Sequence, residues 1–378
     1  MHRRTAQRGV TLVELMIAMV ISLLVLLGVA TVYSSSKRSY KVQEEMARLQ
    51  ENARYAFASM AGDITEAGFA GCNPKLQNLL NTNQGALFDF MAGIDGWEYT
   101  ATSTAPGQSY TITSLANTGS TSDWTSYDWG NGAGTDLAAE LDGNVLRGND
   151  VLVIKKNILR DDIGLQQTPI TAAAIPTGNA TGIPQCSIVV VTDCQRGVVF
   201  QKGNNASASS LTRATGACSP GNSNPSNPWP FEITDQFRAM EAKSYAYYVG
   251  PGASGEPALF RADYGAGSIV IEELVEGVEN MQVLYGEDLT PTDTDYRPTR
   301  YVTADNITHP DNVMSVRVSL LVRTPQELNR PQASRTLRLL GVDAATGVDV
   351  TTMNDRRVRK VFTSTFFLRN KGLYRERP

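Results

Sequence analysis

The chain has 378 residues, of which 42% are hydrophobic and 19% charged, and its formal net charge is −4. This composition is typical of a globular protein with room for two or three domains, and it excludes a disordered chain or a polytopic membrane protein. The only histidines are His2 and His309, so a histidine-rich zinc site is excluded. A Ser–His–Asp or Cys–His apparatus would depend on His309 alone if the N-terminus is removed.

A basic leader precedes one long apolar segment at the N-terminus. Arg3, Arg4 and Arg8 occur there without an acidic residue, and residues 10–33 then carry a single charge, Glu14. About 20 apolar residues span a bilayer as a helix, and the basic flank predicts a cytoplasmic N-terminus with the body on the far side.

Three simpler interpretations of this segment compete. A cleaved secretory signal has an apolar region of about 7–15 residues, and this one is longer. A simple signal anchor fits the length but leaves Glu14 unexplained, because a carboxylate inside a membrane costs about 2.5–3.5 kcal/mol on insertion scales. A chance charge near the membrane surface is the third interpretation. An intramembrane carboxylate predicts a functional partner.

The sequence GVTLVE at residues 9–14 resembles the prepilin processing site of type IV pilins and type II secretion pseudopilins. Their pattern is a short basic leader, Gly, an apolar residue, Thr-Leu, any residue and Glu, followed by an apolar helix. The first mature residue of these proteins is usually Phe, and Val10 departs from that. The resemblance implies that a prepilin peptidase cuts between Gly9 and Val10 and N-methylates Val10. It also implies that Glu14 neutralises the N-terminal amine of a neighbouring subunit, and the chain would then consist of a leader (1–9), an assembly helix (10–33) and further segments.

The helical pattern continues past the apolar segment. Apolar residues recur at spacings of three and four, which predicts one amphipathic helical face over residues 34–67. Gly68, Gly71 and Pro74 then predict the end of the helix. The face consists of Val42, Met46, Leu49, Ala53, Ala56, Met60 and Ile64.

The remainder, residues 68–378, is predicted to be a β-rich head. Residues 73–149 are rich in Gly, Ser, Thr, Asn and Asp and give no clear pattern. From Asp150 on, β-branched and alternating runs predict short antiparallel strands, and so an α+β, pilin-like fold. These runs are Val151–Ile154, Ile188–Thr192, Val198–Gln201, Tyr245–Val249, Ala258–Ala262, Ile269–Leu274, Val278–Tyr285, Val313–Arg323, Thr336–Leu340 and Val358–Leu368.

Several segments of the head show to which group of pilin-like proteins the resemblance extends. Leu274–Gly286, Val316–Thr324 and Lys360–Asn370 resemble segments of the large minor pilin family PilW and of its secretion counterpart, the J-type pseudopilin. The turn at Gly68–Cys72 and the segment Val191–Cys194 favour PilW.

The four cysteines predict two disulfides, because the chain crosses a membrane into an oxidising compartment. Three pairings are possible. A strand between Cys186 and Cys194 would hold them roughly 26 Å apart, far beyond the 4.4–6.8 Å or so that a disulfide allows. We therefore expect Cys72–Cys194 with Cys186–Cys218, and free buried thiols are the alternative.

A polar loop carries three aromatic residues, Trp124, Tyr127 and Trp129. Such residues can form a contact surface, which gives a rival hypothesis of a membrane-anchored module that binds glycan or DNA. More often they fold back on their own domain, and that is the interpretation we favour. Removal of the leader leaves 31 basic against 38 acidic residues, a net charge of −7, which argues against nucleic acid.

No catalytic or metal constellation is predicted. Asp288, Asp293 and Asp295 lack the ligand spacing of a calcium loop and predict a solvated acidic loop. His309 precedes a proline, which predicts extended backbone in a surface loop. We therefore expect a protein without enzymatic activity, cofactor or metal.

The resemblance to PilW implies a minor pilin that helps initiate type IV pilus assembly and is incorporated at or near the tip. Its implied partners are other minor pilins, the major pilin, a pilus-tip adhesin, the prepilin peptidase and the inner-membrane assembly platform. The chain would first lie in the inner membrane with a periplasmic head and later in the extracellular pilus. A J-type pseudopilin of type II secretion is the nearest alternative.

Overall fold

The computed structural model describes the chain from Gly9 to Asn370 with internal gaps. The described ranges are 9–71, 76–81, 85–90, 92–100, 109–112, 117–128, 135–193, 195–213, 218–223, 228–265, 268–290, 297–328, 331–340 and 347–370.

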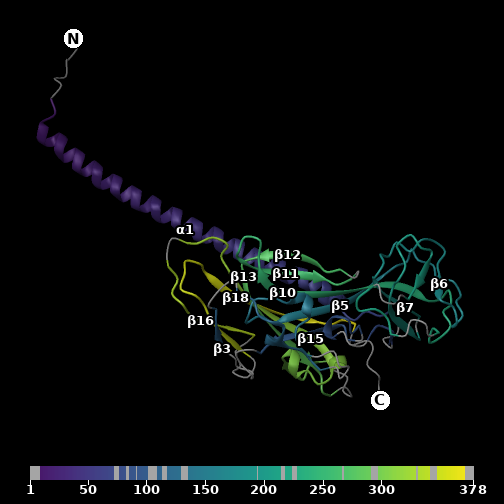
Figure 1. Cartoon of the computed structure of the whole chain (residues 1–378). Coiled ribbons are helices and arrows are strands. Elements are labelled where there is room, and N and C mark those ends of the chain that lie inside the picture. The colour runs from purple at the N-terminus through teal and green to yellow at the C-terminus, as the bar shows by residue number, and fades with distance from the viewer. Residues whose placement is uncertain are drawn as a thin grey trace, which may run out of the picture.

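One helix, α1 (Leu12–Glu66), leads into a head made of β-strands (Figure 1). At about 1.5 Å per residue, the 55 residues of α1 extend for about 80 Å. Its N-terminal half projects away from the head, and its C-terminal half lies along it (Figure 1). The helix ends as predicted, since Gly68 and Gly71 take positive φ values of 69° and 76° that close the turn.

Two principal sheets and two small ones form the head. The nine-stranded sheet has the order β1-β8-β7-β10-β5-β2-β4, with β11 and then β12 joined to β10. The four-stranded sheet has the order β14-β13-β15-β18, and the small sheets are β16-β17-β3 and β6-β9. The strands are β1 Leu76–Asn78, β2 Ile94–Tyr99, β3 Ser109–Thr111, β4 Trp124–Thr125, β5 Val151–Leu159, β6 Ala174–Pro176, β7 Ile188–Thr192, β8 Gly197–Gln201, β9 Ser210–Thr212, β10 Arg238–Pro251, β11 Pro257–Asp263, β12 Val270–Glu276, β13 Val278–Glu287, β14 Arg300–Val302, β15 Val313–Arg323, β16 Thr336–Leu339, β17 Val348–Thr351 and β18 Arg359–Phe367.

The main core lies between α1 and the two large sheets. Leu49, Ala53 and Ile64 of α1 pack there against inward side chains of β5, β10, β13 and β15. The ring of Phe57 lies 6.2 Å from that of Phe366 on β18, centroid to centroid. This confirms the predicted amphipathic face, but its burial begins later than expected. Val42 is 40% exposed, because it borders an open hollow between the helix and the head.

A second lobe lies at the end of the head opposite the free helix, around β6 and β7 (Figure 1). Its own core contains Phe200, Trp229 and Phe237. The long strand β10 joins the lobes, because its first residues pair with β7 and its later residues pair with β5 and β11. All ten predicted strands occur, and the predominance of antiparallel pairing confirms the α+β, pilin-like expectation.

Candidate assembly site

The free half of α1 is apolar and uncovered. Val10 is 73% exposed, Leu12 76% and Tyr33 69%. Among the described residues, α1 is the one helix whose length and hydropathy allow it to cross a membrane. A helix that is apolar on every side is stable in lipid or against other helices, and not in water. This half of the helix is therefore the surface that requires a partner.

The N-terminus of this helix is closed by a capping box. The backbone N–H and the hydroxyl of Thr11 both donate to Oε2 of Glu14 at 3.0 Å, and the N–H of Glu14 donates back to the Thr11 hydroxyl at 3.2 Å. Glu14 thus satisfies two donors of its own helix end and still presents a carboxylate to its surroundings. Gly9 and Val10 precede the helix in exposed backbone, and the leader residues 1–8 lie outside the described residues.

A buried polar cluster joins the other half of α1 to the head. Asp63 is 5% exposed and accepts a hydrogen bond from the hydroxyl of Tyr247 at 2.6 Å. Its carboxylate also pairs with Nζ of Lys156 at 2.7 Å and with the guanidinium of Arg261 at 3.4 Å. Burial raises the pKa of the Tyr247 hydroxyl, and the Asp63 carboxylate raises it further. Because charges from β5 and β11 converge on one helix residue, this cluster fixes how the helix leaves the head.

A second junction lies nearer the membrane half. The backbone N–H of Gln326 donates to the Glu45 carboxylate at 3.2 Å, and Nζ of Lys41 donates to the carbonyl of Glu327 at 3.3 Å. The guanidinium of Arg357 donates to the carbonyl of Thr324 at 2.8 Å. The segment that follows β15 is thereby held between the helix and the head.

Buried ion pairs support that segment from within. Glu279 is 3% exposed and accepts hydrogen bonds from the guanidinium of Arg359 at 2.6 and 2.8 Å and from that of Arg323 at 3.2 Å. Burial, together with the charges of the neighbouring Arg357 and Arg359, lowers the pKa of Arg323 to about 9. Removing one partner of such a network leaves an uncompensated buried charge.

A buried carboxyl pair joins the two large sheets. Asp150 accepts hydrogen bonds from the N–H of Val283 on β13 at 2.8 Å and from the N–H of Tyr99 on β2 at 3.3 Å. Burial raises the pKa of Asp150 to about 7, and it raises the pKa of Glu98, which lies beside it, well above its ordinary value. Two carboxyl groups so close together in a dry site share a proton.

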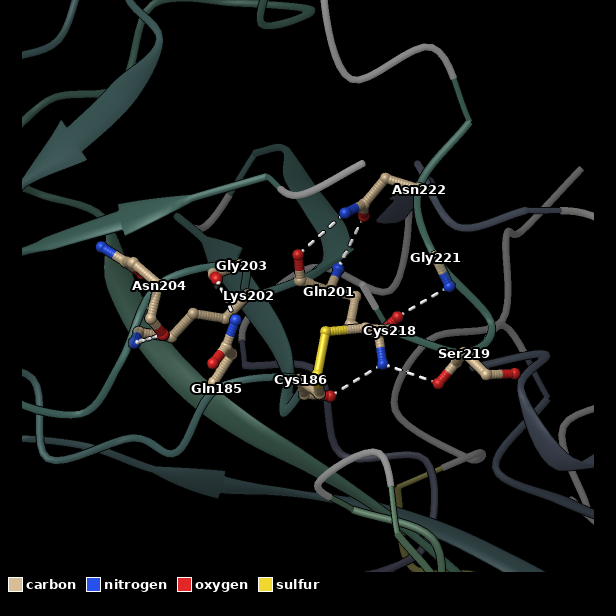
Figure 2. The surroundings of a disulfide bond; sticks show 10 residues. All are labelled: Gln185, Cys186, Gln201, Lys202, Gly203, Asn204, Cys218, Ser219, Gly221 and Asn222. Atoms are coloured by element: carbon tan, nitrogen blue, oxygen red, sulfur yellow. Dashed lines mark hydrogen bonds between the residues drawn. A yellow bond between two sulfur atoms is a disulfide. The ribbon is translucent and has the colours of Figure 1, made fainter. Parts of the chain in front are cut away.

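The disulfide Cys186–Cys218 is present in the second lobe, as predicted, with its Cα atoms 5.4 Å apart (Figure 2). Gln201 supports it, since its side-chain amide donates to the carbonyls of Cys186 and Ser219, both at 2.8 Å. Asn222 in turn bonds both the N–H and the carbonyl of Gln201, at 2.7 and 2.8 Å (Figure 2). The other expected pair, Cys72–Cys194, lies outside the described residues.

The first aromatic residue of the polar loop, Trp124, is buried and not exposed. Trp124 is 0% exposed, and its indole N–H donates to the carbonyl of Asn149 at 2.6 Å. Its ring lies 5.3 Å from that of Tyr99, so it folds back on its own domain as we expected. Tyr127 is half-buried, and Trp129 lies outside the described residues. A glycan or DNA site could not use Trp124 without unfolding β4.

The prediction of a solvated acidic loop is wrong at Asp288. Asp288 is 0% exposed, because its carboxylate accepts the N–H of Thr290 at 2.8 Å and so closes a turn at the end of β13. Asp293 and Asp295 lie outside the described residues. Within the described residues, no group of three or more His, Cys, Asp or Glu side chains could hold a metal ion. His309 is exposed in extended backbone, with φ −136° and ψ 89°, as predicted.

The structure thus combines one free apolar helix with an N-terminal capping box and a β-rich head held on its second half. This arrangement is a pilin-like fold, and its N-terminal helix is long and apolar enough to anchor it in a membrane. Residues 246–370 match the family model described as type IV pilus-assembly protein W, and residues 4–30 match that of the prokaryotic N-terminal methylation motif. The chain is therefore PilW-like over residues 246–370 and carries a prepilin-type methylation motif at its N-terminus, and both families are structural rather than enzymatic. No curated protein and no solved structure matches the chain.

The two matches fit the geometry. The PilW-like segment begins within β10 and ends after β18, so it contains the whole four-stranded sheet against which α1 packs. It also contains the three segments that gave the sequence resemblance. Residues 72–245, which include the second lobe and its disulfide, lie outside both matches. Sequence patterns missed Asp63 and Glu45 as junction residues, although an acidic residue on the apolar side of an amphipathic helix is the signal that could have revealed them.

Proposed function

We propose that this chain is a minor pilin that helps initiate type IV pilus assembly and is incorporated at or near the pilus tip. The observation that carries the proposal is the uncovered apolar half of α1, continuous with a helix face built into a PilW-like head. The same surface suits two successive environments, the lipid of the inner membrane and the helices of neighbouring subunits.

Processing supplies the partner for Glu14 in this proposal. Cleavage between Gly9 and Val10 would create an amine at Val10, four residues and about 6 Å along the axis from Glu14. In a low-dielectric helix bundle a carboxylate and an ammonium group attract strongly, and each is costly if left alone. Glu14 would therefore pair with the amine of an adjacent subunit and set the axial register between the two helices.

The proposed partners follow from this role. Other minor pilins and the major pilin would pack against the free helix, and the prepilin peptidase and the inner-membrane assembly platform would act on it before assembly. The second lobe, at the end of the head far from the membrane helix, would face away from the cell surface and is the part best placed to meet a pilus-tip adhesin (Figure 1). The lobe's separate core and disulfide fit it for the extracellular environment.

Deletion of the gene tests the proposal. We expect major pilin to fall in sheared surface fractions while secreted enzymes, assayed in parallel, stay at their normal level. Intact pili with failed secretion would instead assign the chain to a type II secretion pseudopilus as a J-type subunit. Other minor pilins could replace this chain, so the deletion is repeated in a strain that lacks them. If surface pili and secretion were both unchanged there, the assembly role would be refuted.

A further inference from the structure

Three basic side chains cluster where α1 emerges from its apolar half. Lys37, Arg38 and Lys41 follow the last apolar residue, Tyr33, within eight positions, or about 12 Å of helix. Lys37 and Arg38 are exposed and Lys41 is half-buried. Lys41 is four positions from Lys37 and three from Arg38, so all three project from neighbouring positions of one helix surface. Like charges at these spacings destabilise a helix unless anions approach them.

The nearest carboxylates on the helix have other partners. Glu44 pairs with Arg48 at 2.8 Å, and Glu45 accepts the backbone N–H of Gln326 at 3.2 Å. Within the part of the chain that the structure describes, no ion pair involves Lys37, Arg38 or Lys41. The cluster therefore remains a net cationic surface next to the membrane segment.

Two half-open hollows lie against this cluster. One, of about 780 Å³, lies between the helix and the head, with Arg38 and Lys41 beside the apolar side chains of Val42, Leu328 and Pro331. The other, of about 610 Å³, is lined by Lys37 and Tyr40 with the same two cations, and also by Arg48 and by Glu44 and Glu45, whose carboxylates have the partners given above. Each hollow thus offers cationic groups, and the first also offers an apolar wall.

We infer that this cluster, Lys37, Arg38 and Lys41, binds the headgroups of anionic phospholipids. The phosphates would contact the three cations, and the glycerol and upper acyl carbons would cover the apolar wall of the larger hollow. The occupant is argued from charge complementarity and from position. The hollows begin where an apolar span of bilayer length ends, and Tyr33 and Tyr40, each 69% exposed, mark the level at which aromatic side chains meet the interface.

The inference rests on the membrane placement of α1 in the proposed function, and it adds a consequence. A head held by lipid at the bilayer surface keeps its apolar helix inserted until other subunits replace the lipid. Each basic side chain near an anionic surface strengthens the attraction by about fivefold, and salt weakens it. Three cations are therefore expected to favour an anionic lipid over a zwitterionic one by tenfold or more.

The test uses the full chain, purified in detergent and stripped of lipid, and native mass spectrometry. Phosphatidylglycerol or phosphatidylcholine is added, and the bound lipids are counted for each. We expect at least a tenfold preference for phosphatidylglycerol in the unaltered chain, and its loss in the triple variant Lys37→Gln, Arg38→Gln and Lys41→Gln. Equal binding of both lipids by the unaltered chain would overturn the inference.

A matched control removes the same amount of charge elsewhere. Arg54, Lys360 and Arg369 are exposed on the helix and the head and line neither hollow, and their triple replacement by Gln is expected to keep the preference. If the control variant loses the preference for phosphatidylglycerol equally, the net charge of the chain and not the cluster causes the preference, and the inference fails. Melting curves of both variants show whether each remains folded.

Inorganic phosphate separates a lipid site from a site for free anions. Phosphate is expected to displace phosphatidylglycerol no more than chloride does at equal ionic strength, and a much stronger effect of phosphate would overturn the lipid assignment. The lipid assay needs no pilus machinery. The lipid preference can therefore be absent while gene deletion still abolishes pili, and the preference can be present while deletion leaves pili intact.

Discussion

Replacing Asp63 by alanine is expected to loosen the junction between α1 and the head. The substitution removes the nearer of two acceptors of the buried Tyr247 hydroxyl and one carboxylate partner of Lys156 and of Arg261. Breaking a buried ion pair by removing one partner costs about 3–5 kcal/mol. Lys156 keeps Glu66 at 3.0 Å, so we take the lower end, about 3 kcal/mol. At about 2 °C per kcal/mol, the melting temperature should fall by roughly 6 °C.

Glu66→Ala is the matched control. Glu66 lies on the same helix and pairs with the same lysine, but its side chain is 65% exposed. Exposed ion pairs contribute about 0–1 kcal/mol, so this variant should melt within about 2 °C of the unaltered chain. Thermal unfolding of the full chains in detergent, followed by near-ultraviolet circular dichroism, makes the comparison. Equal shifts for the two variants, or a loss under about 1 kcal/mol for Asp63→Ala, would refute the reasoning.

Three further predictions concern the head. Because burial raises the pKa of Asp150 to about 7, the folded state holds protons that the unfolded state releases near pH 4, so stability should fall as pH rises from about 4 to about 7. In Glu98→Gln the amide can donate a hydrogen bond to Asp150 without a titratable proton, so the fall in stability between about pH 4 and about pH 7 should become shallower. The measurement is the urea midpoint of unfolding as a function of pH, and an unchanged dependence on pH would contradict the shared proton. Replacing Cys186 and Cys218 by Ser should cost about 3–4 kcal/mol for a 32-residue separation, measured by urea unfolding, and a loss under about 1 kcal/mol would contradict it. Glu279→Ala removes the buried carboxylate that Arg323 and Arg359 share and leaves them Glu256 and Asp355, and it should cost about 3 kcal/mol in the same assay, with a neutral effect as the contrary result.

Much of the fold could be predicted from sequence because its signals are local. The 3.6-residue period defined the helix up to its glycine turn, and β-branched runs such as Ile188–Thr192 defined strands that are buried on both faces. The processing motif at Gly9–Glu14 was equally local, and the family match to residues 4–30 confirms the resemblance.

Strand β2 (Ile94–Tyr99) could not be predicted in this way. It is buried at every residue, yet it contains Asp95, Gly96 and Glu98, which local propensity disfavours in strands. Its stability comes from distant partners. The hydroxyl of Tyr285 donates to the carbonyl of Asp95 at 2.9 Å, and a Cβ at position 96 would collide with that hydroxyl. Tertiary contacts that span 190 residues leave no periodic trace.

The junction at Asp63 was hidden for a similar reason. A helix pattern shows which face is buried, but the cations that neutralise Asp63 come from β5 and β11, far along the chain. For Asp288 the sequence-based prediction was wrong. An acidic residue in a loop predicts solvation, but a turn hydrogen bond at the end of β13 buries it.

The most direct test of the account separates the charge of Glu14 from its capping role. Glu14→Gln keeps an acceptor for Thr11 and loses the charge, whereas Thr11→Ala loses the two capping bonds of the hydroxyl and keeps the carboxylate. The measurement is the amount of each tagged variant in sheared pili, relative to its amount in the membrane. We expect Glu14→Gln to be processed but nearly absent from pili, while Thr11→Ala assembles close to normally. Normal incorporation of Glu14→Gln would contradict it.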